Sequence, residues 1–526
     1  MSSDSVFEAR HALRRLVRQP GFSVPVALTL ALGIGATAAV FALVNGVLIR
    51  PLPYAEANRL VEIGHTASRV DLPMTGVSSG TADYYRAHNR VFEDIGVYVE
   101  HVGTLTDRDQ PERVRWAFAT PSVFSVLRPA VTAGRLINPP DYEAGVVGVV
   151  HGALISHDLW VRRYGADPSL VGRTVELDRR PYPVVGVLER GFHFPHPETD
   201  VWLAFGWPSP AKAGLGALWA SAVARLKPGV SLGEARRDLQ RLVHSLPDAF
   251  PDVTQAQLDA MGLRGAVVPL KDAIIGDVSV ALLLLLATGG FLLLITWANA
   301  ANLSLVRAEG LRHEVAVAQA LGATDRNLGR RFLTEGAILA TVGGALGSVL
   351  ASAAIRVHFG FAPDDIPRLR EVGVDLTVVA VIFGLSLASA DLLAGVAFLS
   401  ARRRADLAGT LAGAGGRTTA GHRQQVVRSV LVAGQVAFAL ALLIGSALMA
   451  QSFWRLRHVR LGFDPDGAVA FRLPLPPPTG TKNYYHATAR IHQEVLERLR
   501  AIPGVVAAEA ASTSGFPVTP VPSFYN

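Results

Sequence analysis

Long apolar runs that alternate with polar stretches dominate the pattern of this 526-residue chain. A bilayer core about 30 Å thick is crossed by roughly 20 apolar residues in helical conformation. Five runs reach that length, and they predict spanning helices at residues 24–49, 278–305, 332–357, 376–399 and 430–452. Several nearly uncharged runs in one chain argue against buried helices of a soluble protein. The sequence therefore predicts a multi-pass α-helical membrane protein.

The first run differs from a cleaved secretory signal peptide. It is longer than the apolar region of such a peptide, and no Ala-x-Ala-like site precedes Arg50. We therefore expect residues 24–49 to remain in the protein as its first spanning helix.

The charged residues predict the orientation of these helices. Arginines are concentrated in the polar segments 1–20, 306–331 and 400–429, whereas the short segment after the third run holds Asp364, Asp365, Glu371 and Asp375. Arginine-rich short loops face the cytoplasm. We therefore expect a cytoplasmic N-terminus, with residues 51–277 and 453–526 outside.

The segment 51–277 alternates β-like runs with helical stretches. Residues 60–63 and 182–188 read as strands, and residues 82–90 and 232–242 read as helices, with turn signals between them. More than two hundred residues can bury a core of their own. The sequence predicts an inserted α+β domain of two subdomains.

The tail 453–526 begins a similar pattern. It reads as a strand at 468–473, a helix at 487–499 and a strand at 505–511. Because this stretch is much shorter than the first external segment, we expect the start of a second external domain that is truncated at residue 526.

Two polar segments flank the spanning helices. Residues 1–20 predict an amphipathic helix that suits the inner membrane surface, with one apolar side and one basic side: Val6, Leu13, Leu16 and Val17 on the first and Arg10, Arg14 and Arg18 on the second. Simple charge flanking of the first span explains the same arginines equally well. Residues 400–429 are rich in Arg, Gly, Ala and Thr without apolar periodicity, so they predict a flexible cytoplasmic linker.

Composition excludes several classes of chemistry. The net charge of +7 follows the helix ends without interleaved aromatics, which favours lipid head groups over nucleic acid as the partner. The chain has no cysteine, and it has no Gly-x4-Gly-Lys-Ser/Thr phosphate loop. His193, His196 and Glu198 have metal-like spacing, but a His-Pro surface turn is the preferred interpretation. We expect no catalytic residue, no metal site and no cofactor in this chain.

Two features inside or beside the spans carry a functional signal. Asp391 lies within the fourth run, where a carboxylate is costly and suggests function, although it can also reach the interface by snorkelling. Residues 312–324 (RHEVAVAQALGAT) place apolar side chains at helical spacing beside Arg312 and Glu314, and Gly322 is placed to end that helix. A short amphipathic helix of this kind can dock on a soluble partner.

The segment 312–324 resembles the Arg-x-x-Glu-Ile-Ala-Val-x-x-Ala-Leu-Gly-Ala loop of the MacB/FtsX-type ABC transporter permeases. Within that family the chain is most similar to the duplicated orphan permeases first described in acidobacteria. Further stretches that carry the resemblance are QPGF at 19–22, LALGIGA at 30–36, LIRPLPY at 48–54, PERV at 111–114, DPSLVGR at 167–173 and NAANL at 299–303.

The resemblance implies a bacterial cytoplasmic (inner) membrane protein with a MacB-like periplasmic core domain at 51–277. It implies an FtsX-like module on the second to fourth spans and a second half that begins at the fifth. An ATP-binding cassette ATPase subunit would bind ATP and dock beneath the coupling loop 306–331. The coupling residues carried over by position are Arg312, Glu314, Ala320, Leu321, Gly322 and Ala323.

The chain departs from the family pattern at Gln319, where relatives carry a basic residue, and at Asp391, where they carry an apolar residue or proline. The sequence thus leaves two functions open. One is a permease-type subunit that is driven by a separate ATPase and transmits motion to the periplasmic domain for efflux or envelope transport. The other is a membrane-anchored periplasmic binding or signalling protein without energy coupling. Membrane lipids, a second copy of the chain and further envelope proteins are the other candidate partners.

Overall fold

The computed structural model describes residues 3–69, 72–108, 110–138, 141, 152–204, 218, 220–276, 278–311, 314, 317, 321, 324–361, 368, 372–411, 420–459, 469 and 484–509. The chain divides into two compact units. The helical unit comprises Met1–Arg50 and Ile275–Pro465, and the sheet unit comprises Pro51–Ile274 and Asp466–Asn526.

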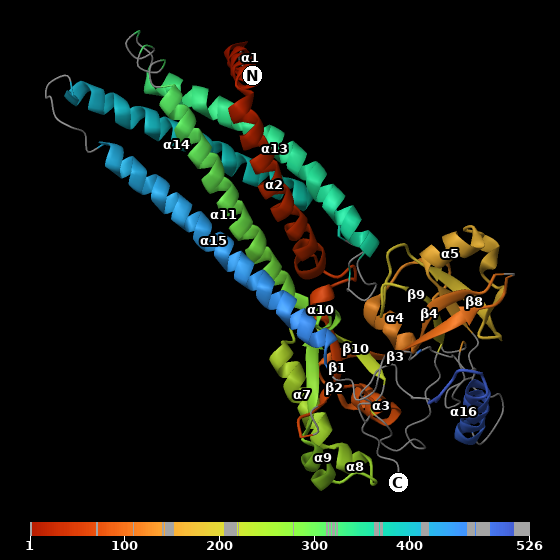
Figure 1. The fold of residues 1–526 in the computed structure, drawn as a ribbon. Helices are drawn as coiled ribbons and strands as arrows, with labels where there is room; N and C mark the ends of the chain where they lie inside the picture. Colours follow the sequence, from red (N-terminus) through yellow and green to blue (C-terminus); the bar gives the residue numbers. More distant parts are fainter. Residues whose placement is uncertain are drawn as a thin grey trace. The chain divides into compact units, whose positions relative to one another are not determined.

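Long apolar helices build the helical unit (Figure 1). Within the described residues, five helices are long and apolar enough to cross a membrane. They are α2 (Pro20–Val44), which continues as the π-helical turn η1 (Asn45–Ile49), α11 (Val278–Gly310), α13 (Asp325–Phe361), α14 (Leu376–Leu411) and α15 (Ala420–Arg457). The predicted fold class, a multi-pass helical membrane protein with an α+β domain, is confirmed.

Glycines let α2 and α13 approach closely. A Cβ atom on Gly35 would lie 2.8 Å from the backbone oxygen of Gly347, and a Cβ atom on Gly343 would lie 2.7 Å from the Cβ of Leu30. Small residues are favoured where spanning helices must bring their backbones together. These glycines therefore serve the close packing of α2 and α13.

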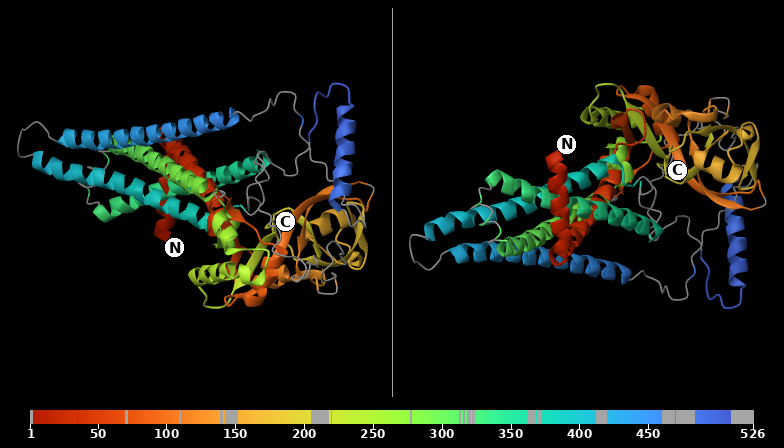
Figure 2. Two further views of the ribbon diagram at one scale, coloured as in Figure 1. Left: turned by 90° about the horizontal axis from the view of Figure 1, so that it is seen from below. Right: turned by 90° about the horizontal axis from the view of Figure 1, so that it is seen from above.

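The helix α15 is packed much less than its neighbours. It runs beside α11 in all three ribbon views (Figures 1 and 2), and the Phe438 ring stacks on Phe291 of α11 at 5.2 Å between centroids. No residue in its most apolar stretch is buried inside the protein, whereas 56% of the corresponding stretch of α2 is buried.

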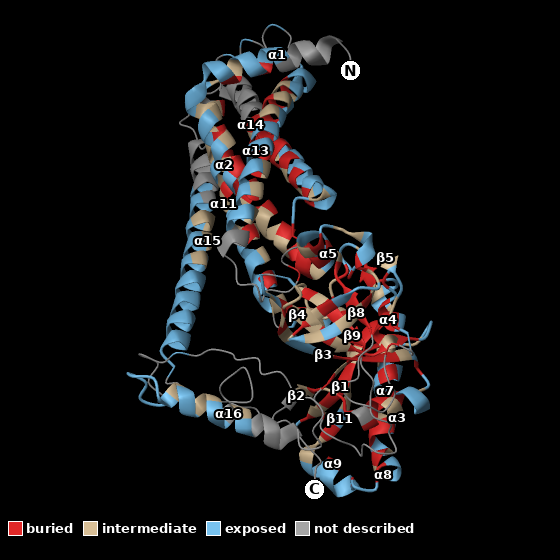
Figure 3. Cartoon of the chain, turned by 90° about the vertical axis from the view of Figure 1, so that its right-hand side faces the viewer, coloured by how far each residue is buried: buried red, intermediate tan, exposed pale blue. Residues whose placement is uncertain are grey.

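The helix α1 (Ser3–Arg18) is separated from α2 by a single non-helical residue. Gln19 has φ −121° and ψ 61°, and Pro20 opens α2. Proline disfavours helical conformation in the residue before it and is well suited to the first helical position. The break turns α1 across the end of the bundle (Figure 3), where Ala12 and Leu16 are buried.

The predicted linker 400–429 is largely helical where it is described. The helix α14 continues to Leu411 and α15 already begins at Ala420. Alanine, leucine and arginine are strong helix formers and the segment has no proline, so both helices extend beyond their apolar runs. The prediction of a flexible linker is therefore wrong for 400–411 and 420–429.

One eleven-stranded sheet organises the sheet unit. Its order is β11-β1-β10-β3-β4-β9-β6-β8-β5, with β2 beside β1, and β7 beside β3 and β8. The strands are β1 (Leu60–Ala67), β2 (Leu72–Thr75), β3 (Phe92–Leu105), β4 (Glu112–Ala119), β5 (Val131–Gly134), β6 (Ala153–Ile155), β7 (Thr174–Leu177), β8 (Arg180–Leu188), β9 (Thr199–Ala204), β10 (Ser221–Leu226) and β11 (Leu263–Pro269).

Helices pack on different parts of this sheet and give it separate cores. Side chains of α3 (Ser79–His88), α7 (Leu232–His244) and α9 (Gln255–Met261) join β1, β3, β10 and β11 in one cluster. Side chains of α5 (His157–Tyr164) join β6 to β9 in another, and those of α4 (Pro121–Leu127) belong to a third. This arrangement follows from the geometry of a β-strand, because successive side chains point to opposite faces of the sheet.

The tail contributes α16 (Tyr484–Arg500), which contains the predicted helix 487–499. Apart from residue 469, the predicted strand 468–473 lies outside the described residues. Residues 505–509 form no strand, contrary to the prediction for 505–511. A β-like sequence becomes a strand only where a partner strand completes its hydrogen bonds.

Candidate functional site: a buried carboxylate and its arginines

Glu335 is a carboxylate inside the third predicted span. It lies on α13, and its side chain is only 2% exposed. A charge at such a position is costly unless partners compensate it, and in spanning segments it suggests function by default. The surroundings of Glu335 are therefore the first candidate for a functional site.

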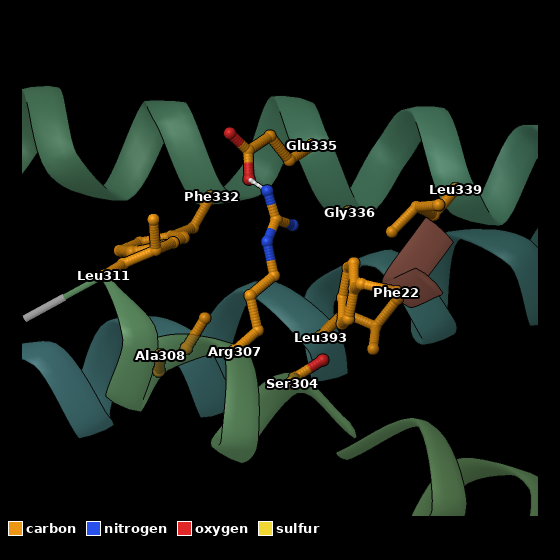
Figure 4. Close-up of a pocket in the computed structure, with 11 residues that line it drawn as sticks. Phe22, Ser304, Arg307, Ala308, Leu311, Phe332, Glu335, Gly336, Leu339 and Leu393 are labelled. Atoms are coloured by element: carbon orange, nitrogen blue, oxygen red, sulfur yellow. Dashed lines mark ion pairs between the residues drawn. The ribbon is translucent and has the colours of Figure 1, made fainter. Parts of the chain in front are cut away.

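Three arginines from three helices surround this carboxylate. Arg307 of α11 is the nearest, with Nη2 2.9 Å from Oε2, and Figure 4 shows this ion pair between the two helices. Arg331 of α13 places Nε 3.6 Å from Oε1, and Arg15 of α1 places Nη1 3.7 Å from the same oxygen. Glu335 thus joins α1, α11 and α13 by charge.

Residues at the start of α2 hold Arg307 in place. Its Nε donates to Oε1 of Gln19 at 3.2 Å, and its guanidinium lies over the Phe22 ring, 4.4 Å from the centroid. A cation over an aromatic face is attracted by the ring quadrupole. The stretch 19–22, which the sequence singled out only by resemblance, therefore positions the main partner of Glu335.

The pair lines a small cavity of about 20 Å³. Among the described residues, neither oxygen of Glu335 has a well-aligned hydrogen-bond donor, so charge attraction rather than directional bonding holds the arginines. The space is large enough for a single water molecule. It is too small for a substrate molecule.

The network reaches the predicted coupling segment. Arg331 Nη2 lies 2.8 Å from Oε1 of Glu314, whose side chain is 51% exposed. Glu314 and Val317 are helical, and Leu321 is 83% exposed. The other coupling candidates, Arg312, Ala320, Gly322 and Ala323, lie outside the described residues. One sequence-predicted coupling residue is thus tied to the buried carboxylate through Arg331.

Asp391 is an exposed residue of α14. No ion pair joins it to another residue of the described part of the chain, and it does not line the cavity beside Glu335. A functional role for Asp391 stays a prediction.

The histidines near residue 195 take part in local contacts. The backbone N–H of Glu198 donates to Nδ1 of His196 at 3.2 Å, and Arg115 pairs with Glu198 at 3.4 Å. Tyr54 donates to the carbonyl oxygen of His193 at 2.5 Å. No group of three or more His, Cys, Asp or Glu side chains in the described part of the chain could hold a metal ion.

A buried histidine lies in the sheet unit. His65 Nδ1 is 2.8 Å from the carbonyl oxygen of Gly76, which can only accept, so Nδ1 carries the proton and Nε2 accepts from the Tyr85 hydroxyl at 2.6 Å. Burial disfavours the charged ring and lowers the pKa of His65 to about 4. The pair is neutral and structural at neutral pH.

Sequence reasoning missed Glu335, although the signal was present. It is an acidic residue inside the predicted span 332–357, the same kind of signal that drew attention to Asp391. Its arginines could not be assigned to it, because residues 15, 307 and 331 meet only after the helices pack.

Comparison with known proteins adds a family for part of the chain. Residues 23–242 match the family described as the MacB-like periplasmic core domain. The chain therefore contains a domain of this type, as the sequence resemblance implied. No curated protein sequence matches this chain.

The solved structures that are similar to the chain include two transporter domains. One is the extracellular domain of the noncanonic ABC-type transporter YknZ from Gram-positive bacteria, with 15% identity over 36% of this chain and 93% of that chain and a TM-score of 0.27. The other is the periplasmic region of MacB from Actinobacillus actinomycetemcomitans, with 14% identity over 45% of this chain and 95% of that chain and a TM-score of 0.30.

Proposed function

We propose that this chain is the permease-type subunit of an ABC transporter-like complex. In this proposal a separate ATPase supplies the energy, and the helices transmit motion to the periplasmic domain for efflux or envelope transport. The match of residues 23–242 to the MacB-like periplasmic core domain is the observation that carries it. Because the sequence has no phosphate loop, ATP must be bound by another subunit.

The ion-pair network supports a route for the motion. In the proposal the ATPase contacts the segment with Arg312, Glu314 and Ala320 to Ala323. A displacement of Glu314 pulls on Arg331, which shares Glu335 with Arg307. The helices α11 and α13 would then move together with the segment around Glu314 rather than one by one.

The orientation is part of the same proposal. Arginine-rich segments lie at the end of the bundle that carries Arg15, Arg307 and Arg331, and such segments face the cytoplasm. The N-terminus would then be cytoplasmic and the sheet unit periplasmic in a bacterial inner membrane. This places Glu314 on the side where an ATPase has access.

Reversing the charge of Glu314 tests the proposal. Glu314 is 51% exposed although its partner Arg331 is only 18% exposed, so the Glu314→Lys variant should lose about 1 kcal/mol of folding stability. Breaking one side of a buried contact with a partner costs about 2 to 5 kcal/mol of association. We expect wild type to capture an ABC ATPase from detergent-solubilised membranes, and the variant to lose that capture.

A matched control is available in α16. Glu494 pairs with Arg498 at 2.6 Å and is 61% exposed, so Glu494→Lys makes the same charge change at a similar surface pair. The control should retain ATPase capture. Undiminished capture by the Glu314 variant would contradict the coupling role. Absence of an ATPase from the wild-type sample would favour the periplasmic binding or signalling protein.

A further inference from the structure

The helix α1 presents two different faces. Ala12 and Leu16 are 5% and 4% exposed, because they pack against the bundle. Leu13 and Val17, one residue further along, are 50% and 70% exposed. Residues four apart in a helix lie on the same side, so Leu13 and Val17 form an apolar strip that faces away from the bundle.

A row of arginines runs beside this strip. Arg10, Arg14 and Arg18 follow each other at intervals of four, and all three are exposed. Among the described residues none of the three has an ion-pair partner. Arg15 differs from them, because its guanidinium points to Glu335 at 3.7 Å. Within the described residues, the row is therefore a set of three cations without an ion-pair partner on one face.

The position of α1 indicates that its exposed face lies at the membrane surface. The first candidate span begins at Pro20, only two residues after Arg18. Two residues of chain reach at most roughly 7 Å. Because α1 also lies across the end of the bundle (Figure 3), it is held at the depth where the hydrocarbon ends and the lipid head groups begin. An apolar strip beside a basic row suits that boundary.

We propose that α1 is a binding site for anionic phospholipid head groups. Leu13 and Val17 enter the boundary between head groups and acyl chains, while Arg10, Arg14 and Arg18 contact lipid phosphates. The proposal deepens the proposed function, because the same helix supplies Arg15 to Glu335. Lipid binding would thereby set the position of Arg15, one of the arginines that pair with Glu335.

The absence of native cysteine allows a direct test on the full chain. A nitroxide attached to the Val17→Cys variant is used to measure the depth of this position in the bilayer. The depth is obtained from the accessibility of the nitroxide to oxygen and to a water-soluble nickel complex. The protein is placed in nanodiscs of phosphatidylcholine, with or without one third phosphatidylglycerol. We expect the nitroxide to move deeper when phosphatidylglycerol is present.

Substitutions then distinguish the role of the exposed arginines from the role of Arg15. Replacing Arg10, Arg14 and Arg18 together by Gln should abolish the dependence on phosphatidylglycerol, since each arginine near an anionic surface is worth roughly fivefold in binding. Arg15→Gln should retain it, because Arg15 serves Glu335. Each variant is compared with itself in the two lipid compositions, so a change in overall stability does not mimic the effect.

Three results would overturn the proposal. They are an unchanged depth of the wild-type nitroxide in both compositions, equal losses for Arg15→Gln and the triple variant, and a depth response to inorganic phosphate at constant ionic strength. A nitroxide that is indifferent to phosphatidylglycerol but immobilised by added ATPase would assign the row to a protein partner. The depth assay without ATPase is independent of ATPase capture, so either proposal can fail alone.

Discussion

Glu335→Gln is the sharpest perturbation of the helical unit. The substitution keeps the shape of the side chain but removes the charge that compensates Arg307, whose side chain is only 12% exposed and lies 2.9 Å away. Removing one partner of a buried ion pair costs about 3 to 5 kcal/mol, because the other charge is left uncompensated. We expect a loss of roughly 3 kcal/mol in the free energy of unfolding.

The control is Arg15→Gln, which removes a weaker partner of the same carboxylate. Arg15 is 42% exposed and 3.7 Å from Glu335, so its loss should cost about 1 kcal/mol or less. Unfolding is followed in mixed detergent micelles with increasing SDS for wild type and both variants. If Glu335→Gln is no less stable than Arg15→Gln, the carboxylate does not hold the helices together and the reasoning fails.

Three further outcomes follow from the structure. The contribution of His65 to the stability of the sheet unit should fall by about 3 kcal/mol between pH 6.5 and pH 4, because the ring binds a proton in the unfolded state but stays neutral where it is buried. Pulse proteolysis across this range should therefore show a sheet unit that is more sensitive to acid in wild type than in His65→Gln. Gly35→Ala should destabilise the helical unit in the SDS assay, since its Cβ would meet the Gly347 oxygen at 2.8 Å, whereas Gly384→Ala has open space and should not. Asp391→Leu should insert and remain as stable as wild type because the residue is exposed; a loss above about 1 kcal/mol would reveal a polar contact.

The spans could be predicted because a bilayer imposes one simple requirement on each of them. Length and apolarity of a single segment decide whether it crosses, and both are visible in the sequence. The glycines of α2 and α13 carried an equally local signal, because a helix without side chains at those positions invites close approach. The ends of α14 and α15 were misjudged because the lack of apolar periodicity was given more weight than helix propensity.

The network around Glu335 could not be assembled from the sequence. Arg15 and Arg307 are separated from Glu335 by 320 and 28 residues, and only the packed helices bring them to one carboxylate. The His65–Tyr85 pair was missed for the same reason, since neither residue signals a partner on its own. Glu314 was found because its segment resembles a known loop, and its contact with Arg331 needed the structure.

The sparse packing of α15 has a consequence for how the protein is assembled. A helix whose most apolar stretch is not buried by its neighbours is stable in the bilayer before they arrive, so its insertion depends on its own mean hydropathy of 2.0. The helix α2 and the turn η1 that continues it bury polar Thr37 and Asn45, whose surroundings come from the other helices. Both helices are apolar enough to enter the membrane on their own, with mean hydropathies of 2.2 for α2 and 2.0 for α15, but only α2 then depends on segments translated later to surround its buried polar side chains.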